Sequence, residues 1–184
     1  MDKSRIALRT LAAVMVLSGC ASGGSVRAGE EVSAPGAMAD ADVAAVAHAA
    51  DLDEIQTSQV ALQRSQNAQV RQFAEQMIAE HTAADREMRQ MLQAKGMAVQ
   101  PSPAAAQATA TTVANLGRRT GLDFDRAYMA HQVQAHRWTL TSLDRTLIPS
   151  TRDPELKAFL ATRVRPAVAM HLEMAERNGG TEMK

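Results

Sequence analysis

The sequence predicts an all-α protein, a four-helix bundle with a longer link between its second and third helices. Apolar residues recur at steps of three and four along four long stretches, the spacing of one helix face. Hydrophobic residues make up 46% of the 184-residue chain, but aromatic residues only 3%. A core of Ala, Val, Leu and Met suits closely packed helices better than sheets. We expect the bundle over residues 40–180.

The first predicted helix spans about residues 42–64. Glu54 lies beside its apolar stripe, in line with the small residues Ala47 and Ala61. These neighbours would let another helix approach the carboxylate closely. The alternative is that Glu54 is a boundary or solvent-facing carboxylate.

The second predicted helix, residues 67–95, has the clearest stripe, in which His81 is the polar member. Asn67 is suited to cap its start, and Gly96 to end it. The short link before Asn67 predicts that the first two helices are antiparallel neighbours. Pro101 and Pro103 follow, and a short helix around residues 105–116 would cross over the bundle or cover one end.

The third predicted helix opens at a capping box, Thr120 with Asp123, and ends near Ile148. His136 is the polar member of its stripe. The fourth spans residues 154–177, after Asp153 as N-cap, and carries His171 on its stripe. Pro166 lies inside this helix and predicts a kink.

Three predicted helices thus each place one histidine on the core-facing stripe, and the first offers Glu54. Imidazole and carboxylate ligands suit Zn, Fe, Mn or Cu, and bundle cores hold such sites. We assumed that both short links lie at one end of an up-down bundle. At about 1.5 Å per residue, the four side chains then lie between ~16 and ~31 Å from that end, a spread of two to three turns. The alternative is that each histidine is a structural side chain satisfied by a neighbour.

Two methionines allow a copper interpretation. Met77 precedes His81 by four residues, and Met174 follows His171 by three. Thioethers with imidazole suit Cu(I), although methionine on a stripe is more often a core residue. The remaining histidines, His48 and His131, are expected at the surface or rim, with Tyr128 as a hydrogen-bond partner of His131.

The N-terminus predicts an exported lipoprotein. Residues 1–19 join a basic start to a short apolar run, as in a secretory signal peptide rather than a membrane span. The ending Leu17-Ser18-Gly19-Cys20 resembles a bacterial lipobox, in which the cysteine carries lipid; plain secretion with an incidental Cys20 is the alternative. Residues 20–39 would form a flexible tether. In lipoproteins of this class, an Asp directly after the cysteine often retains the protein in the inner membrane. Residue 21 is Ala, so the resemblance favours anchoring on the periplasmic side of the outer membrane.

Composition excludes several function classes. Lys plus Arg equals Asp plus Glu at 20 each, so nucleic-acid binding has no electrostatic support. Neither a glycine-rich phosphate loop nor a set of residues for nucleophilic catalysis is recognisable. An enzymatic activity therefore has little support, and the protein partner is unknown.

The combined pattern resembles the bacterial family catalogued as domain of unknown function 4142, over about residues 42–177. The segments that carry the resemblance are Asp53-Glu54-Ile55, Asn67 to Ala74, Met77 to Thr82, Gly121 to Asp125 with Tyr128, Gln132, Val133 and His136, and Pro166 with His171 and Leu172. The resemblance implies a ferritin-like fold, frequent export or lipid anchoring, and Glu54, His81, His136 and His171 as parts of the family pattern. It implies no activity. The Glu-x-x-His pairs of ferritins are missing, so di-iron chemistry does not carry over.

These observations lead to two hypotheses of different classes. In the first, a lipid-anchored envelope bundle binds a metal ion (Zn, Fe or Cu) through Glu54, His81, His136 and His171. In the second, the protein is a non-enzymatic scaffold or interaction module whose histidines are structural. A small redox enzyme at the same site is a third, weaker idea.

Overall fold

The computed structural model describes residues 38–180 of the chain. The predicted signal peptide, the predicted lipidation site Cys20 and nearly all of the predicted tether lie outside these residues and stay predictions. None of the helices between residues 38 and 180 is long and apolar enough to span a membrane.

The described part of the chain is helical, without strands, as predicted. Its elements form five rods, because α4 runs through η1 into α5 and α6 through η2 into α7. The bounds are α1 Asp40–Arg64, α2 Ala68–Ala94, α3 Pro103–Gly117, α4 Gly121–Ser142, η1 Leu143–Leu147, α5 Ile148–Ser150, α6 Pro154–Phe159, η2 Leu160–Val164 and α7 Arg165–Gly180.

Local capping signals account for most helix ends. The Asn67 side chain accepts hydrogen bonds from the Gln69 and Val70 N–H groups at 2.9 and 3.4 Å, and Asp153 caps α6 in the same way. Gly96, with φ +72°, follows the end of α2, where a residue without Cβ takes the left-handed conformation at little cost. The predicted capping box at Thr120 is wrong: its side chain makes no cap bond. Asp123 instead accepts hydrogen bonds from Arg119, at 3.0 Å to each carboxylate oxygen.

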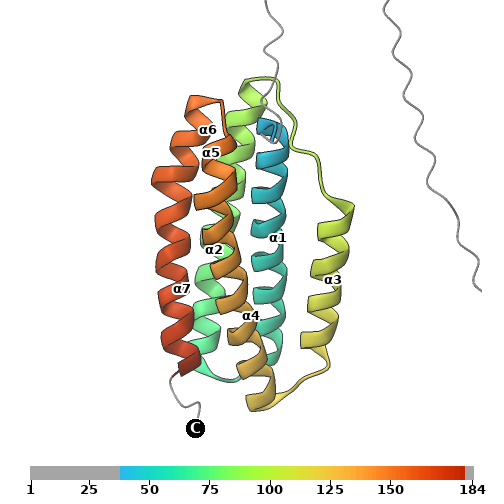
Figure 1. The fold of residues 1–184 in the computed structure, drawn as a ribbon. Coiled ribbons are helices and arrows are strands. Elements are labelled where there is room, and N and C mark those ends of the chain that lie inside the picture. Colours follow the sequence, from blue (N-terminus) through green and yellow to red (C-terminus); the bar gives the residue numbers. More distant parts are fainter. Residues whose placement is uncertain (1–37, 181–184) are drawn as a thin grey trace, which may run out of the picture. The chain divides into compact units, whose positions relative to one another are not determined.

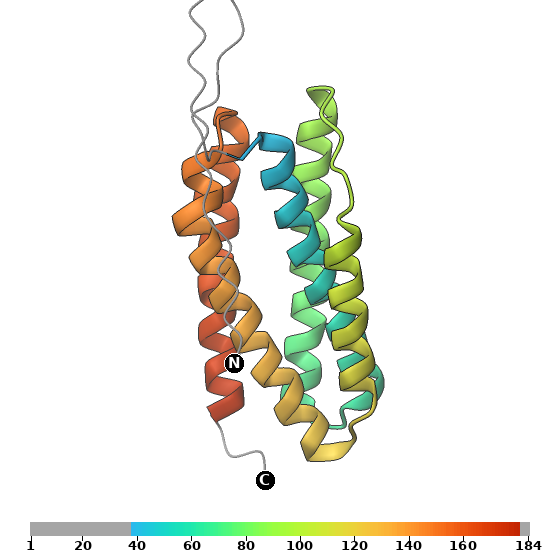
Figure 2. The ribbon, with the colours of Figure 1, turned by 45° about the vertical axis from the view of Figure 1, so that its right-hand side comes forward.

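The order of the rods in space differs from the assumed up-down arrangement. Figures 1 and 2 show α1 running down, α2 up, α3 down on the outside, α4 up and α6–α7 down. The α1–α2 link therefore lies at one end and the α5–α6 link at the other. The depths counted from a shared end are wrong for this reason, since the helical crossover α3, packed mainly against α1, reverses the chain once more.

Two prolines shape the second half of the chain. Ile148, just before Pro149, donates its N–H to the Leu143 carbonyl, and Arg165, just before Pro166, donates to the Leu160 carbonyl. Both bonds span five residues and make π-helical turns. Proline has no N–H and crowds the preceding turn, and a widened turn accommodates both effects. The rods pass through both prolines, so the predicted helix end before Pro149 is wrong.

The core consists of two apolar clusters separated by a polar layer. One cluster includes Met77, Met129 and Ala175; the other includes Met88, Leu143 and Val168. The buried histidines His81 on α2, His136 on α4 and His171 on α7 each lie in sequence between members of the two clusters. The apolar clusters thus fix the height at which these histidines meet.

Candidate metal centre

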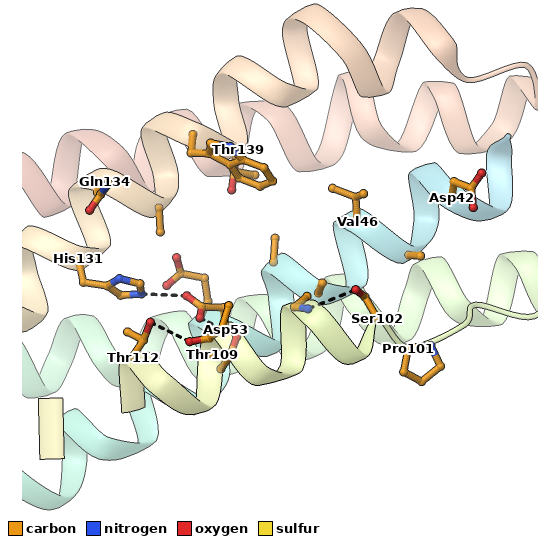
Figure 3. Close-up of a pocket in the computed structure, with 18 of the residues that line it drawn as sticks. Asp42, Val46, Asp53, Pro101, Ser102, Thr109, Thr112, His131, Gln134 and Thr139 are labelled. Carbon is orange, nitrogen blue, oxygen red and sulfur yellow. Dashed lines mark hydrogen bonds and ion pairs between the residues drawn. The ribbon is translucent and has the colours of Figure 1, made fainter. Parts of the chain in front are cut away.

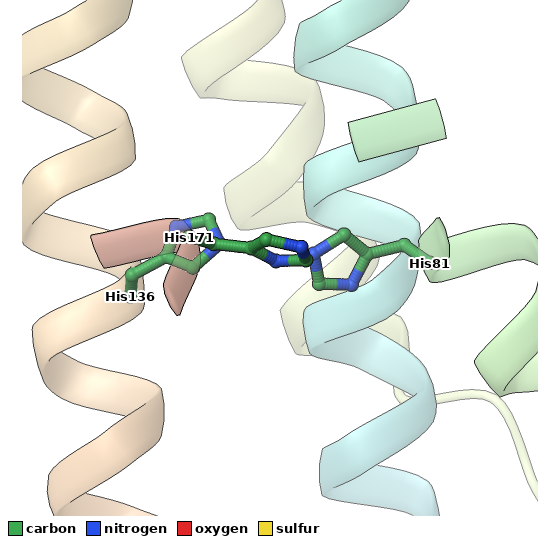
Figure 4. Close-up of side chains that lie close together, drawn as sticks. All are labelled: His81, His136 and His171. Atoms are coloured by element: carbon green, nitrogen blue, oxygen red, sulfur yellow. The ribbon is translucent and has the colours of Figure 1, made fainter. Parts of the chain in front are cut away.

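Three histidines from three rods meet inside the protein. Each offers one ring nitrogen to a group whose members all lie within 4.8 Å of one another. The ring centroids are 5.8 Å apart for His81 and His136, 5.3 Å for His81 and His171, and 5.4 Å for His136 and His171. Figure 4 shows the three side chains pointing toward one another. They are 7%, 1% and 1% exposed in sequence order, so water contributes little to their hydrogen bonding.

The hydrogen bonds of the rings define which nitrogen is free. His81 Nδ1 lies 2.8 Å from Asp51 Oδ1, and His171 Nε2 lies 2.9 Å from Glu80 Oε2. His136 Nδ1 lies 2.9 Å from the Gln132 carbonyl oxygen. A carbonyl or carboxylate oxygen accepts, so each of these nitrogens carries the proton and donates.

The opposite nitrogen of each ring has no hydrogen-bond partner among the described residues. These atoms are His81 Nε2, His136 Nε2 and His171 Nδ1. In a neutral ring the nitrogen opposite a donating N–H carries a lone pair. When all three rings are neutral, three lone pairs are buried together without donors among the described residues, although buried polar atoms are normally paired. A cation is the partner that satisfies all three at once.

The environment keeps two of the rings neutral. Burial, together with the neighbouring His81, lowers the pKa of His136 to about 3. Burial also lowers the pKa of His171, against the opposing effect of its Glu80 hydrogen bond. Burial alone would lower the pKa of His81 too, but its hydrogen bond to Asp51 and that carboxylate's charge outweigh burial and raise it. At neutral pH, His136 and His171 are thus in the form that binds metal ions.

Glu54 lies beside this group, on α1. It is 4% exposed, and its Oε1 is 3.4 Å from His136 Nδ1, the nitrogen opposite the free one. Its Oε2 has no hydrogen-bond partner among the described residues. Burial raises its pKa to about 7. The structure thus brings the three predicted histidines together and places the fourth predicted ligand next to them, outside the group of converging nitrogens.

Sequence analysis missed the groups that hold the rings. Asp51 reaches from α1 to His81, and Glu80 reaches from α2 to His171 rather than to its neighbour His81. In the sequence, Asp51 and Glu80 could be recognised only as acidic residues at the edge of an apolar stripe. The Gln132 carbonyl, four residues before His136, had no signal in the side-chain pattern.

The other two histidines also pair with acids. His48 is buried and lies 2.6 Å from Asp85, so its expected surface position is wrong. His131 is half-buried and lies 2.8 Å from Asp53. Tyr128 pairs with Ser58 at 2.8 Å rather than with His131.

Met77 belongs to the first apolar cluster, and Met174 packs against it. Both methionines have the environment of core residues. The donor set that the structure brings together is three imidazoles.

The fold and this site define an all-helical protein with a buried cluster of three metal-competent histidines. The chain belongs to the family described as Domain of unknown function (DUF4142), whose model matches residues 26–177. No curated protein and no solved structure matches the chain.

Proposed function

We propose that the protein binds one transition-metal ion through His81, His136 and His171. One observation carries the proposal: three buried nitrogens that have no partner in the described part of the chain meet, while the opposite nitrogen of each ring is fixed by an acceptor. Metal-binding histidines usually donate their second N–H to a carboxylate or carbonyl, which fixes the tautomer and raises ligand basicity. Asp51, Glu80 and the Gln132 carbonyl supply those acceptors here.

The donor set suits Zn²⁺, Fe²⁺ and Cu²⁺ alike, because imidazole is a good ligand for each. Three protein ligands leave a fourth position for a small exogenous ligand. Glu54, the fourth ligand predicted from the sequence, can take that position only if its side chain moves from its contact with His136 Nδ1. We therefore treat Glu54 as a neighbour whose negative charge supports the ion.

The site lies in what we interpret as a ferritin-like bundle. Support comes from the short α1–α2 link, the crossover α3 and the parallel course of α2 and α4 (Figure 2). Carboxylate-bridged di-iron chemistry is not part of the proposal, because the converging group consists of imidazoles alone.

We also propose that the protein is a lipoprotein of the bacterial envelope. The support is in the sequence: the basic and apolar start, the ending Leu17-Ser18-Gly19-Cys20 and the small polar residues that follow it. By this interpretation, lipid on Cys20 anchors the domain to the periplasmic side of a membrane, the outer rather than the inner one.

The scaffold hypothesis has one observation in its favour. Each of the 5 histidines in the sequence has an acidic side chain within 3.4 Å, as structural histidines often do. That hypothesis leaves the three free nitrogens of the cluster unexplained.

Metal content separates the two hypotheses. The full chain carrying Cys20→Ser, without a histidine tag, is incubated with Zn²⁺, Fe²⁺ or Cu²⁺, freed of excess metal and measured by elemental analysis. We expect about one ion per chain, lost in His136→Ala and retained in His48→Ala, which removes a buried histidine outside the cluster. Equal metal content in all three proteins, or none in any, refutes the proposal.

A further inference from the structure

The converging nitrogens of the histidine cluster are closed to solvent. On the side of the first apolar cluster, Met77, Met129 and Ala175 are fully buried. An ion that reaches the rings therefore needs a route that joins a surface group to one of them.

One such route lies between α2 and the rod formed by η2 and α7. A chamber of about 30 Å³, with room for about one or two waters, is lined there by Glu80, Arg163, His81 and His171. The Glu80 and Arg163 side chains are 39% and 59% exposed, whereas both rings are buried. The chamber thus begins at charged surface groups and ends at two of the three proposed ligands.

Glu80 joins the surface to the cluster by a direct contact. Its Oε2 accepts the hydrogen bond of His171 Nε2 at 2.9 Å, and its Oε1 accepts one from Gln76 Nε2 at 2.8 Å. Each carboxylate oxygen has a second lone pair, so this half-exposed side chain can bind a divalent ion from solvent. The ring behind it carries Nδ1, one of the atoms without a partner among residues 38–180.

His171 is also the ring that can turn at the lowest cost. The groups that hold the other two rings are Asp51, with a side chain 13% exposed, and the carbonyl of the fully buried Gln132. Releasing either ring would leave a buried acceptor without a donor. Glu80 can bind water instead, so the cluster opens most easily at the chamber.

Figure 3 looks into a larger groove, between α1, α3 and α4. It has a carboxylate of its own, Asp53, which accepts hydrogen bonds from His131 and Thr109 at 2.8 Å each. Of the described residues that line this groove, none is a histidine of the cluster, and Glu54 Oε2 at its inner side is closed to solvent. An ion attracted to Asp53 thus has no opening to the rings.

A second small chamber, of about 20 Å³, reaches His81 and His136 from the side of α1 and α4. Among the described residues that line it, only Trp138 is exposed, and its side chain carries no charge. A divalent ion that passed this way would lose its hydration before meeting a surface carboxylate, which is costly.

We propose that a divalent metal ion first binds Glu80 and enters between α2 and α7 while His171 turns aside. Arg163 opposes the approach of the ion by its charge, which Glu87, 3.9 Å away, reduces in part. Once the ion lies among the three rings, Glu80 again holds His171 Nε2. This inference rests on the proposed function, because it needs an ion that ends at the histidines.

The arrival of Cu²⁺ can be followed with Trp138, the only tryptophan of the 184-residue sequence. Trp138 lines the same small chamber as His81 and His136, so bound Cu²⁺ should quench its fluorescence. The full chain carrying Cys20→Ser is mixed with excess Cu²⁺ at neutral pH and low salt in a stopped-flow instrument. The dependence of the quenching rate on copper concentration gives the rate constant for binding. His136→Ala, which removes a ligand, should lack this quenching.

Three variants test the route. Glu80→Gln keeps an acceptor for His171 but removes the charge at the chamber, and should bind copper about tenfold more slowly. Asp53→Asn is the matched control: it removes the same charge from the groove and should change the rate by less than about twofold. Arg163→Gln should raise the rate about threefold, and the effects of Glu80→Gln and Arg163→Gln should shrink at high salt.

The results separate failure of the route from failure of the metal site. If wild-type protein binds copper but Glu80→Gln and Asp53→Asn bind it at equal rates, the site stands and the route is overturned. A slower rate in Arg163→Gln overturns it as well. If wild-type protein shows no quenching, or His136→Ala shows the same quenching, the proposed function fails and the route with it.

Discussion

Replacing His171 with leucine should abolish metal binding and yet stabilise the metal-free protein. The substitution removes the buried Nδ1, which has no hydrogen-bond partner within residues 38–180, and such an atom costs about 1–3 kcal/mol. It also removes the hydrogen bond to Glu80, worth about 1 kcal/mol. The Glu80 side chain is 39% exposed and can turn to water. We therefore expect a gain of roughly 1 kcal/mol, or about 2–4 °C in Tm for a domain of this size.

His81→Leu should behave in the opposite way. Its partner Asp51 has a side chain only 13% exposed and would be left as an unpaired buried carboxylate. Removing one member of a buried pair costs about 3–5 kcal/mol. The two substitutions are chemically identical and differ in the burial of the acid left behind.

The assay is urea unfolding with a chelator, repeated with Zn²⁺. Wild-type protein should gain about 2.7 kcal/mol at a free metal concentration of 100 times Kd, and both variants should gain nothing. If His171→Leu destabilises the metal-free protein as much as His81→Leu does, the free nitrogens carry no cost, and the reasoning that leads to a metal ion fails.

Three further predictions follow from the same structure. Glu54→Gln should weaken metal binding about 10–100-fold, as loss of an outer-shell group does, in a chelator-competition assay; complete loss would make Glu54 a direct ligand, as the sequence predicted. Zinc affinity measured by calorimetry should fall as the pH is lowered from 7.5 to 5.5, because protons compete with zinc for the ring nitrogens. His81, whose pKa is raised, is the first of the three rings to be protonated. An unchanged affinity would place the ion elsewhere. Tyr128→Phe should lower the free energy of unfolding in urea by about 1–3 kcal/mol, because it leaves the buried Ser58 hydroxyl without its partner. Adding Ser58→Ala to this variant should recover part of that loss. Additive losses from the two substitutions would contradict this pairing.

The helices were predictable because their signals are local. The stripe of α2, the Asn67 cap and the Asp153-Pro154 start each depend on residues within one or two turns. The capping box at Thr120 failed because Arg119, one residue earlier, competes for Asp123.

The order of the rods was not predictable from the same signals. Whether residues 103–117 cover one end of the bundle or run alongside α1, as they do, depends on packing between distant segments. That choice decides which ends the short links share, and so the heights of the histidines.

The histidines were recognisable as single polar residues in apolar stripes. Their acceptors were not, because Asp51 and Glu80 reach across to rods other than their own.

The most direct test of the account is X-ray absorption of the zinc-loaded full chain carrying Cys20→Ser. Three imidazole nitrogens at about 2.0–2.1 Å from zinc are expected, with one fewer in His136→Ala if any metal remains. A first shell of oxygen ligands alone, or a shell unchanged by that substitution, would contradict a metal centre built from His81, His136 and His171.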